Sequence, residues 1–472
     1  MTFQDHRLPA LECLERRLLL AATLHVGSTE TYHTIQSAID AAASGDTVLV
    51  DPGTYNEELK ITTSGITVES VDGAGSTFLN GNSANNNFYM VEINADNVTL
   101  KGFDISNPIY SNSADASGVA IGDFTRVSGV KILDNVIHDM GSVTRPVASF
   151  GTYGINDGPS VNTEIAGNTI YNIGNADPNG DAVAILTWGN DSSTTNSGVS
   201  IHDNVIYNIT HPTFASGISV GFESRDAKVM NNTITGVMLG ITTSASIDLN
   251  GTVTITGNAV TGGTTGMTLN SPYLTNVTNN EISGNVDGII SNSVAANNTH
   301  VNQNNITGNS HSGLTNNGTG TLDAEHNWWG SIFGPSGIGP GFGDAVYGDV
   351  DYSNWLTGPA PGAPGSSTVP MTTLQTVLTD LIALQGTVHN KQAAATLASA
   401  INYLENALAP ANWRDASHLT PLGAIVFRDD LAAEALLTQL EGSSGLPKSG
   451  LMAAINDINQ VDQQLKQNAL TP

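Results

Sequence analysis

Residues 130–137 read Val-Lys-Ile-Leu-Asp-Asn-Val-Ile, an alternation of apolar and polar residues interrupted by an asparagine. The same pattern returns along the chain around Asn135, Asn168, Asn204, Asn232, Asn258, Asn280 and Asn305, with a degenerate copy around Asn327. These asparagines are separated by 33, 36, 28, 26, 22, 25 and 22 residues. Alternation with a period of two predicts short strands that each bury one face.

A repeat of this length without a helical stripe predicts a solenoid whose coils each contain three short strands. Asparagine is suited to a corner between strands because it tolerates left-handed backbone angles. Stacked in register, the amides are expected to form a hydrogen-bonded ladder. A second signal, a turn glycine entering a strand, occurs about half a coil away at Gly118, Gly154, Gly217, Gly240, Gly266, Gly288 and Gly313.

Other β-architectures fit the pattern less well. A sandwich or propeller needs hairpin dipeptides and longer alternating runs, and the calcium-binding nonapeptide repeat does not occur in the sequence. Over residues 23–357 the chain resembles the pectin-lyase-like family of right-handed parallel β-helices, including that family's N-terminal cap at residues 34–55. The resemblance implies an all-β solenoid fold. It implies no single reaction, because that fold carries lyases, hydrolases, epimerases, adhesins and proteins without known activity.

The composition is acidic and sparsely charged. Fifteen basic residues against 43 acidic ones give a net charge of −28, while only 12% of residues are charged. This balance argues against nucleic acid and anionic membranes as partners, and mildly against direct binding of acidic polysaccharides. The single cysteine, Cys13, excludes an intrachain disulfide.

The first 22 residues contain Arg16 and Arg17, then a short leucine run. The run is too short to span a bilayer. Residues 11–20 resemble the Leu-Glu-Pro-Arg-x-Leu-Leu leader of secreted planctomycete proteins, with Cys13 near the usual proline. We therefore expect an export or surface-sorting leader at residues 1–22, and a secreted or cell-surface protein.

The two ends of the solenoid are predicted to be covered. Before the first strand, an amphipathic helix over residues 32–43 is expected to cap the open coil. At the other end, Trp328 and Trp329 are expected to seal the last coil, an interpretation favoured over a ligand role for the neighbouring His326.

Residues 358–370 read as a Pro/Gly/Ser linker. Beyond it, residues 371–472 show helical periodicity and resemble small helical modules of secreted bacterial proteins, which are thought to attach or space. The predicted apolar stripes contain Leu374, Val377, Leu378, Leu381 and Ile382; Leu397, Ile401, Leu404 and Leu408; Leu431, Leu436, Leu437 and Leu440; and Leu451, Ile455, Ile458 and Leu465.

Candidate functional residues lie where the coils are long. The extra residues fall in loops at 107–117, 141–153, 174–181, 187–198 and 210–216. In β-helix enzymes such loops wall a substrate cleft, so function is expected here. Aligning the strands places Ala120, Asn156, Ala184, Ser219 and Thr242 in one outward row. Beside this row, Asp157 and Glu223, with Arg225 and Asp123, are candidate catalytic residues, and two suitably spaced carboxylates would fit glycoside hydrolysis. Acids that merely cap turns on an acidic surface are the alternative.

The loop at 175–181 resembles the first half of an EF-hand. Asp177, Asn179 and Asp181 supply oxygen ligands at alternate positions, with Gly180 sixth in the loop. The twelfth position is Leu186 instead of a bidentate glutamate. Calcium at Asp177, Asn179 and Asp181 is therefore one hypothesis, and a turn-rich loop is the other.

Three residues after the ladder asparagine, consecutive coils carry His138, Tyr171 and Tyr207. Alternation places these side chains outward, where stacked rings could bind the flat faces of sugar rings with Asp139, Asn172 and Asn208 beside them. Cross-strand packing is the simpler interpretation. With Trp188, these three residues form the predicted substrate-binding set.

Two classes of function remain. One is a monomeric secreted or surface protein that binds a polysaccharide or builds the cell envelope. The other is a polysaccharide lyase or glycoside hydrolase acting within residues 107–226. The missing catalytic motifs favour the first.

Overall fold

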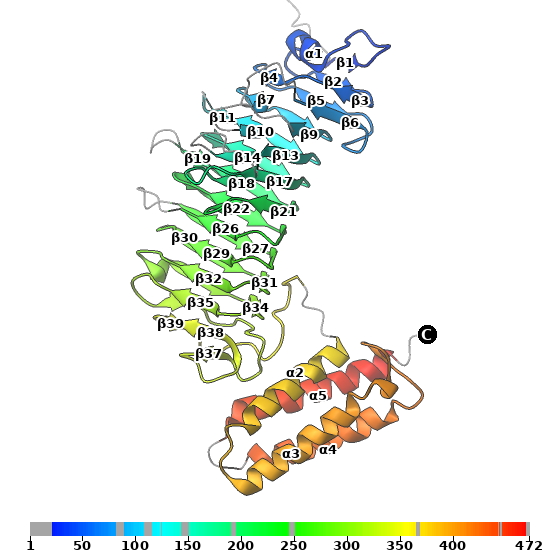
Figure 1. Ribbon diagram of the computed structural model, residues 1–472, viewed down its shortest axis with the longest axis vertical. Helices are drawn as coiled ribbons and strands as arrows, with labels where there is room; N and C mark the ends of the chain where they lie inside the picture. Colours follow the sequence, from blue (N-terminus) through cyan, green and yellow to red (C-terminus); the bar gives the residue numbers. More distant parts are fainter. Residues whose placement is uncertain are drawn as a thin grey trace, which may run out of the picture.

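The computed structural model describes residues 21–81, 89–107, 116–123, 125–142, 151–189, 195–244, 251–364, 369–441, 443 and 446–468. The predicted leader lies mostly outside these residues. The described chain forms a right-handed parallel β-helix followed by a helical bundle at its C-terminal end (Figure 1). The predicted fold class is therefore confirmed.

Three long parallel sheets form the walls of the solenoid, and the chain visits them in the order A, B, C in each full coil. Sheet A has thirteen strands: β1 (Thr23–Val26), β2 (Thr47–Val50), β5 (Thr67–Ser70), β8 (Thr99–Lys101), β12 (Lys131–Leu133), β16 (Glu164–Ala166), β20 (Ser200–His202), β24 (Ala227–Met230), β27 (Thr252–Thr256), β30 (Leu274–Thr278), β33 (Thr299–Asn302), β36 (Leu322–Asp323) and β39 (Val350–Asp351). At the usual strand spacing, thirteen stacked strands make a rod roughly 60 Å long.

Sheet B has ten strands: β3 (Gly53–Tyr55), β6 (Thr77–Asn80), β9 (Asp104–Asn107), β13 (Val136–Ser142), β17 (Thr169–Asn175), β21 (Val205–Thr210), β25 (Thr233–Thr235), β28 (Ala259–Thr261), β31 (Glu281–Ser283) and β34 (Asn305–Thr307). Sheet C has twelve: β4 (Leu59–Ile61), β7 (Tyr89–Ile93), β10 (Ala116–Ile121), β14 (Thr152–Asp157), β18 (Ala182–Thr187), β22 (Ala215–Val220), β26 (Leu239–Thr243), β29 (Thr265–Leu269), β32 (Asp287–Ser291), β35 (Ser312–Asn316), β38 (Gly343–Tyr347) and β37 (Pro335–Gly337).

A short fourth sheet, D, is added where the coils are long. It contains β11 (Val127–Ser128), β15 (Ser160–Val161), β19 (Asn196–Ser197) and β23 (Ser224–Arg225). The inward side chains of all the walls form one continuous apolar core along the rod. A 3₁₀ turn, η1 (Ala296–Asn298), precedes β33.

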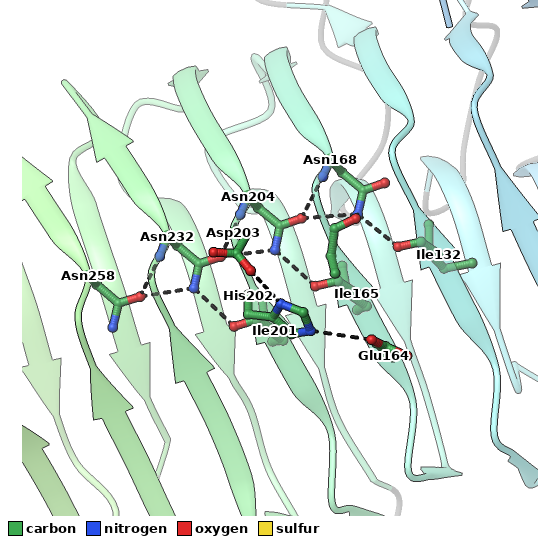
Figure 2. Close-up of polar contacts among 11 residues, drawn as sticks. Ile132, Glu164, Ile165, Asn168, Ile201, His202, Asp203, Asn204, Asn232 and Asn258 are labelled. Carbon is green, nitrogen blue, oxygen red and sulfur yellow. Dashed lines mark hydrogen bonds and ion pairs between the residues drawn. The ribbon is translucent and has the colours of Figure 1, made fainter. Parts of the chain in front are cut away.

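The corner between sheets A and B carries the asparagine ladder (Figure 2). From Asn135 to Asn304, the Nδ2 of each ladder residue donates to Oδ1 of the next asparagine and to a strand carbonyl one coil earlier. Asn204, for example, donates to Asn232 Oδ1 at 2.9 Å and to Ile165 O at 3.0 Å. The same Oδ1 also accepts the backbone N–H of the preceding rung. The buried amide groups of the corner are satisfied in this way.

Two details of the ladder differ from the sequence prediction. The seventh rung is Asn304, which bonds Asn280 and Asn327, whereas Asn305 accepts the Ala360 N–H at 2.7 Å. The ladder asparagines are also not left-handed. Positive φ belongs to the residue just before each rung: Asp134, Gly167, Asp203, Asn231, Gly257, Asn279, Gln303 and His326. The turn is made by this residue, and the rung contributes its side-chain amide.

Helix α1 (Ile35–Ala41) covers the first coil, as expected, with Ile35 and Ala38 fully buried. At the other end, four helices form the bundle: α2 (Pro370–Gln385), α3 (Lys391–Ala407), α4 (Ala424–Glu441) and α5 (Lys448–Asn468), with the 3₁₀ turn η2 (Pro410–Asn412) and an antiparallel pair of β40 (Trp413–Asp415) and β41 (His418–Leu419). The predicted stripes are largely buried, but Leu431 and Ile382 are exposed, by 66% and 47%, and do not belong to the core.

The bundle packs on the last coil of the solenoid. Trp328, Ile332 and Phe333 belong to the apolar core of the helices, whereas Trp329 belongs to the core of the solenoid. Asp380 of α2 accepts the Ile332 N–H at 2.9 Å, and a Cβ on Gly450 of α5 would lie 1.8 Å from the Phe333 ring. Of the two tryptophans predicted to seal the last coil, Trp328 therefore joins it to the helices and Trp329 packs within the solenoid.

Candidate functional site

The rings predicted to lie outward on consecutive coils do stack on sheet B. His138 and Tyr171 have ring centroids 4.8 Å apart at 1° between planes, and Tyr171 and Tyr207 are 5.0 Å apart at 3°. Strand pairing places the three residues in register on β13, β17 and β21. The stack is therefore a direct consequence of strand spacing.

This geometry corrects the predicted use of the ring faces. Rings stacked one strand apart cover each other's faces, so Tyr171 presents only its edge. Tyr207 is the exception: it is 39% exposed, and the residue in register beyond it is Thr235. A threonine side chain is too short to cover the outer part of a tyrosine ring. One aromatic face, that of Tyr207, is open.

His138 lies at the closed end of the stack between two carboxylates. Its Nε2 is 3.0 Å from Asp104 Oδ1 and its Nδ1 is 2.8 Å from Asp139 Oδ2. The hydrogen bond with Asp104 raises the pKa of His138, with Asp139 adding to it and partial burial opposing it. The side chain is only 16% exposed, so its role is to anchor the stack.

The residue after each ring is also in a ladder. Asp139, Asn172 and Asn208 have φ of 54° each. The Asn172 amide donates to Asp139 Oδ1 at 2.9 Å, and the Asn208 amide donates to Asn172 Oδ1. These groups bind each other, and their predicted contact with sugar hydroxyls stays a prediction.

Beyond Tyr207 both positions change to small residues. The outward residue becomes Thr235, Thr261, Ser283 and Thr307, and the left-handed residue after it becomes Gly236, Gly262, Gly284 and Gly308, with φ between 65° and 72°. The surface therefore steps down between β21 and β25. The sequence contained this signal, because the change from His/Tyr-Asp/Asn to Thr/Ser-Gly can be read from the repeats.

A hollow of about 380 Å³ lies at this step. It is lined by Ile209, Thr210, His211, Ala215, Gly236, Met238, Gly262, Gly263 and Thr264. Tyr207 precedes the first lining residue by two positions, roughly 7 Å along the strand. The open ring and the hollow therefore form one candidate binding site, in which Tyr207 was predicted and the hollow was not.

His211 forms part of the hollow's wall, and both of its ring nitrogens bond to the protein. Its Nε2 lies 2.7 Å from Asp177 O, while its Nδ1 accepts the N–H groups of Thr213 at 3.0 Å and Phe214 at 2.9 Å. These contacts select the tautomer with the proton on Nε2. His211 therefore ties the loop at 174–181 to the loop at 210–216.

The outward row of sheet C, expected to face a cleft, is covered instead. Ala120, Asn156, Ser219 and Thr242 are between 1% and 5% exposed. The fifth member is Leu186, because Asn156 pairs with Leu186 and not with Ala184. Ala184 takes the place of the turn glycine, facing the Gly154 position. Trp188 donates its indole N–H to Asn156 Oδ1, a member of this row, at 2.6 Å. Its substrate-binding role stays a prediction.

Asp157 points into the solenoid rather than toward solvent. It is fully buried in the inward row that contains Ile121 and Thr187. Asn196 donates to its Oδ2 at 2.7 Å and Thr163 donates to its Oδ1 at 3.3 Å. Burial raises the pKa of Asp157 to about 7, against the lowering effect of these hydrogen bonds. A carboxyl group without exposed surface cannot contact a polysaccharide, which argues against its predicted catalytic role.

The other candidate catalytic residues are held in separate structural contacts. Glu223 is 5% exposed with φ of 54° in the turn before β23. Arg225 donates to Thr195 Oγ1 at 3.3 Å, and Asp123 accepts the Tyr89 hydroxyl at 2.9 Å. Catalysis by Asp157, Glu223, Arg225 and Asp123 thus gains no support from their placement.

The predicted calcium loop forms turns through its own side chains. Asp177 Oδ1 accepts the Asn179 N–H at 3.0 Å, and the Asp177 N–H donates to Asn175 Oδ1 at 2.9 Å. Within the described ranges, histidine, cysteine and carboxylate side chains do not gather in threes in a metal-binding arrangement. Calcium at Asp177, Asn179 and Asp181 stays a prediction.

Comparisons with known proteins do not specify a function. Neither protein-family models nor curated proteins give a match. Solved structures that are similar include the pectin methylesterase from Aspergillus niger (12% identity, 73% of this chain and 90% of that chain, TM-score 0.29) and pectin methylesterase PemA from Erwinia chrysanthemi (11%, 71% and 90%, 0.30). A family 28 exopolygalacturonase from Yersinia enterocolitica is also similar (10%, 70% and 78%, 0.27). These values are too low to transfer an activity.

In the described part of the chain, none of the helices has the length and apolar character needed to cross a membrane.

Proposed function

We propose that this protein is a non-catalytic glycan-binding protein, secreted or held at the cell surface, whose binding site is the open face of Tyr207 and the adjoining hollow. The exposed ring at the end of the stack is the observation that carries the proposal. A tyrosine presents an apolar face and a polar edge, which matches the apolar face and hydroxyl rim of a sugar ring. The predicted leader supports the location.

The support behind Tyr207 makes the site rigid. Tyr171 and His138 stack under its closed face, and the Asn208 amide is fixed by Asn172. A ring that is already held in place loses little conformational freedom when a ligand packs on it. The hollow beside it combines apolar side chains with Thr210, Thr264 and backbone groups, the mixture expected of a small-ligand site.

The alternative, a lyase or hydrolase acting within residues 107–226, is not supported by a specific contact. The candidate acids are buried (Asp157 and Glu223) or bonded to another side chain (Asp123), and the outward row of sheet C, which would form the floor of a cleft, is covered. Binding rather than turnover is therefore the function that the geometry supports best.

The test compares Tyr207→Ala with Tyr347→Ala, because Tyr347 is equally exposed at 40% on β38, far along the rod. Both proteins and the parent are passed over a panel of immobilised neutral and acidic polysaccharides. We expect one or more polysaccharides to retain the parent and Tyr347→Ala, and Tyr207→Ala to lose at least tenfold in affinity. Retention unchanged by Tyr207→Ala, or no retention of the parent on the panel, would overturn the proposal.

A further inference from the structure

We infer that the Tyr207 site takes an uncharged stretch of glycan, two to three sugar rings long, lying along the solenoid axis. The inference rests on the proposed function and adds the ligand's charge, length and direction. Three observations support it: the residues that line the hollow, the glycines of its floor and the hydrogen bonds of His211.

The hollow runs along the axis rather than along a strand. Its lining residues come from three successive coils, at 209–215, 236–238 and 262–264. Three coils span two strand spacings, roughly 10 Å. A pyranose ring with its linkage is close to one spacing in length, so about two to three rings fit between Tyr207 and Thr264.

The floor of the hollow is open because it is made of glycine. A Cβ on Gly236 would meet no atom within 4 Å, and a Cβ on Gly262 would meet only the Gly236 nitrogen at 3.8 Å. Both residues have positive φ, at 67° and 72°. In the preceding coil the equivalent residue is Asn208, whose side chain bonds to Asn172. The hollow therefore begins where the side-chain ladder stops.

The lining offers no positive charge to a ligand. The ionisable side chain among its residues is His211. Both ring nitrogens of His211 are directed at protein groups, Nε2 at Asp177 O and Nδ1 at the N–H groups of Thr213 and Phe214, so neither is directed at a ligand. Strands β21, β25, β28 and β31 flank the hollow on sheet B, and the one charged residue that these described strands contain is the acidic Glu281. With a net charge of −28 on the whole protein, a uronate or sulfated chain would meet repulsion without a cationic partner.

Polar groups suited to hydroxyls are present instead. Thr210 and Thr264 line the hollow, and Thr235 is exposed beneath Tyr207. Hydroxyl and backbone groups donate and accept hydrogen bonds without requiring a charged ligand. The site therefore discriminates by shape and hydroxyl pattern.

The experiment fills the floor with a side chain that the backbone tolerates. Gly236→Asn adds an amide at φ 67°, which asparagine adopts readily, and extends the ladder from Asn208 into the hollow. Gly308→Asn is the matched control, because it also has φ of 67° and nothing within 4 Å of its Cβ, but lies outside the hollow. Binding is measured by titration calorimetry with neutral oligosaccharides of one to six rings from the polysaccharide that the parent retains, and with oligogalacturonates.

We expect affinity to rise up to three rings and then level, with Gly236→Asn at least tenfold weaker and Gly308→Asn unchanged. Thr235→Tyr, which would cover the open face of Tyr207, gives a second variant, with Thr254→Tyr on sheet A as its control. Normal binding by Gly236→Asn and Thr235→Tyr, a continued rise beyond three rings, or preference for oligogalacturonates would overturn the inference. Loss of binding in Tyr207→Ala would in that case leave the glycan-binding function standing.

Discussion

The long coils around β13, β17 and β21 and the short coils around β25, β28, β31 and β34 have the same interior and different exteriors. Inside, the sheet B residues are Ile137, Ile170, Ile206, Ile234, Val260, Ile282 and Ile306, all buried. Outside, the long coils carry stacked rings and a polar ladder, whereas the short coils carry threonine or serine and glycine. The interior sets the fold, and the exterior is free to vary; the site appears where one exterior changes into the other.

Because the interior is common to both regions, the asparagine ladder should contribute equally to the free energy of unfolding in each. Asn204→Ala would leave the buried Asn168 backbone N–H without its acceptor and would remove one bond of the Asn168 amide, which keeps two carbonyl acceptors. Asn280→Ala would do the same to Asn258. Unsatisfied buried groups cost about 1–3 kcal/mol each. We expect both variants to lose about 3–5 kcal/mol of unfolding free energy in urea denaturation.

Asn292→Ala is the matched control, because its ladder with Asn270 and Asn317 is exposed. Its loss should stay within about 0.5 kcal/mol. A cost at Asn204 much larger than at Asn280 would show that the long loops, and not the shared corner, stabilise the long coils.

The buried carboxyl group of Asp157 is one interior difference between the long coils and the short coils. In the same inward row, the short coils carry Leu269 and Ser291. Its folded pKa of about 7 lies above the ordinary 3.8. Below pH 4 the carboxyl is protonated in both states. Between pH 4 and pH 7 the unfolded state has released the proton while the folded state still holds it. The free energy of unfolding therefore falls by about 4 kcal/mol across this window.

Asp157→Asn should remove this share of the pH dependence. The free energy of unfolding of the variant is therefore expected to rise relative to that of the parent as the pH increases from 4 to 8. Thr163 Oγ1 lies 3.3 Å from Asp157 Oδ1 and also bonds to Ser160 Oγ, so it can accept from the new amide. Unfolding free energies of the parent, Asp157→Asn and the exposed control Asp203→Asn are measured across this range. Parallel curves for the parent and Asp157→Asn would show that Asp157 is ionised in the folded protein.

The stack of His138, Tyr171 and Tyr207 is expected to make the smallest of these contributions to the free energy of unfolding. Tyr171→Ala removes two ring contacts at once, and aromatic pairs contribute about 0.5–1.5 kcal/mol each. We expect a loss of about 1–3 kcal/mol in unfolding free energy, against less than about 0.5 kcal/mol for Thr261→Ala in a short coil. If Tyr171→Ala abolished glycan retention while melting normally, Tyr171 would be a contact residue rather than the support of Tyr207.

Much of the fold could be predicted from the repeats. Period-two alternation specified which side chains point inward, and the spacing of the asparagines specified a solenoid with a ladder at one corner. The errors concern single positions. Asn305 was predicted in place of Asn304 because two asparagines are adjacent, and Ala184 in place of Leu186 because that coil has alanine where the others have glycine.

The site was less predictable. Alternation correctly placed His138, Tyr171 and Tyr207 outward in register, but it says nothing about what covers an outward side chain. The outward row of sheet C is buried while part of sheet B is open, and Asp157 falls on an inward position beyond the strand's apolar residues.

The sequence by itself determined the strand period, the corner asparagines, the acidic surface and the order of aromatic and small residues along sheet B. These are properties of neighbouring residues and of a fixed repeat, so they need no knowledge of distant contacts. The tertiary structure alone decided which ring face is open, which acid is buried and where a hollow forms. These depend on the atoms that successive coils and their loops bring together, and coil lengths that vary from one repeat to the next leave that packing unspecified in the pattern.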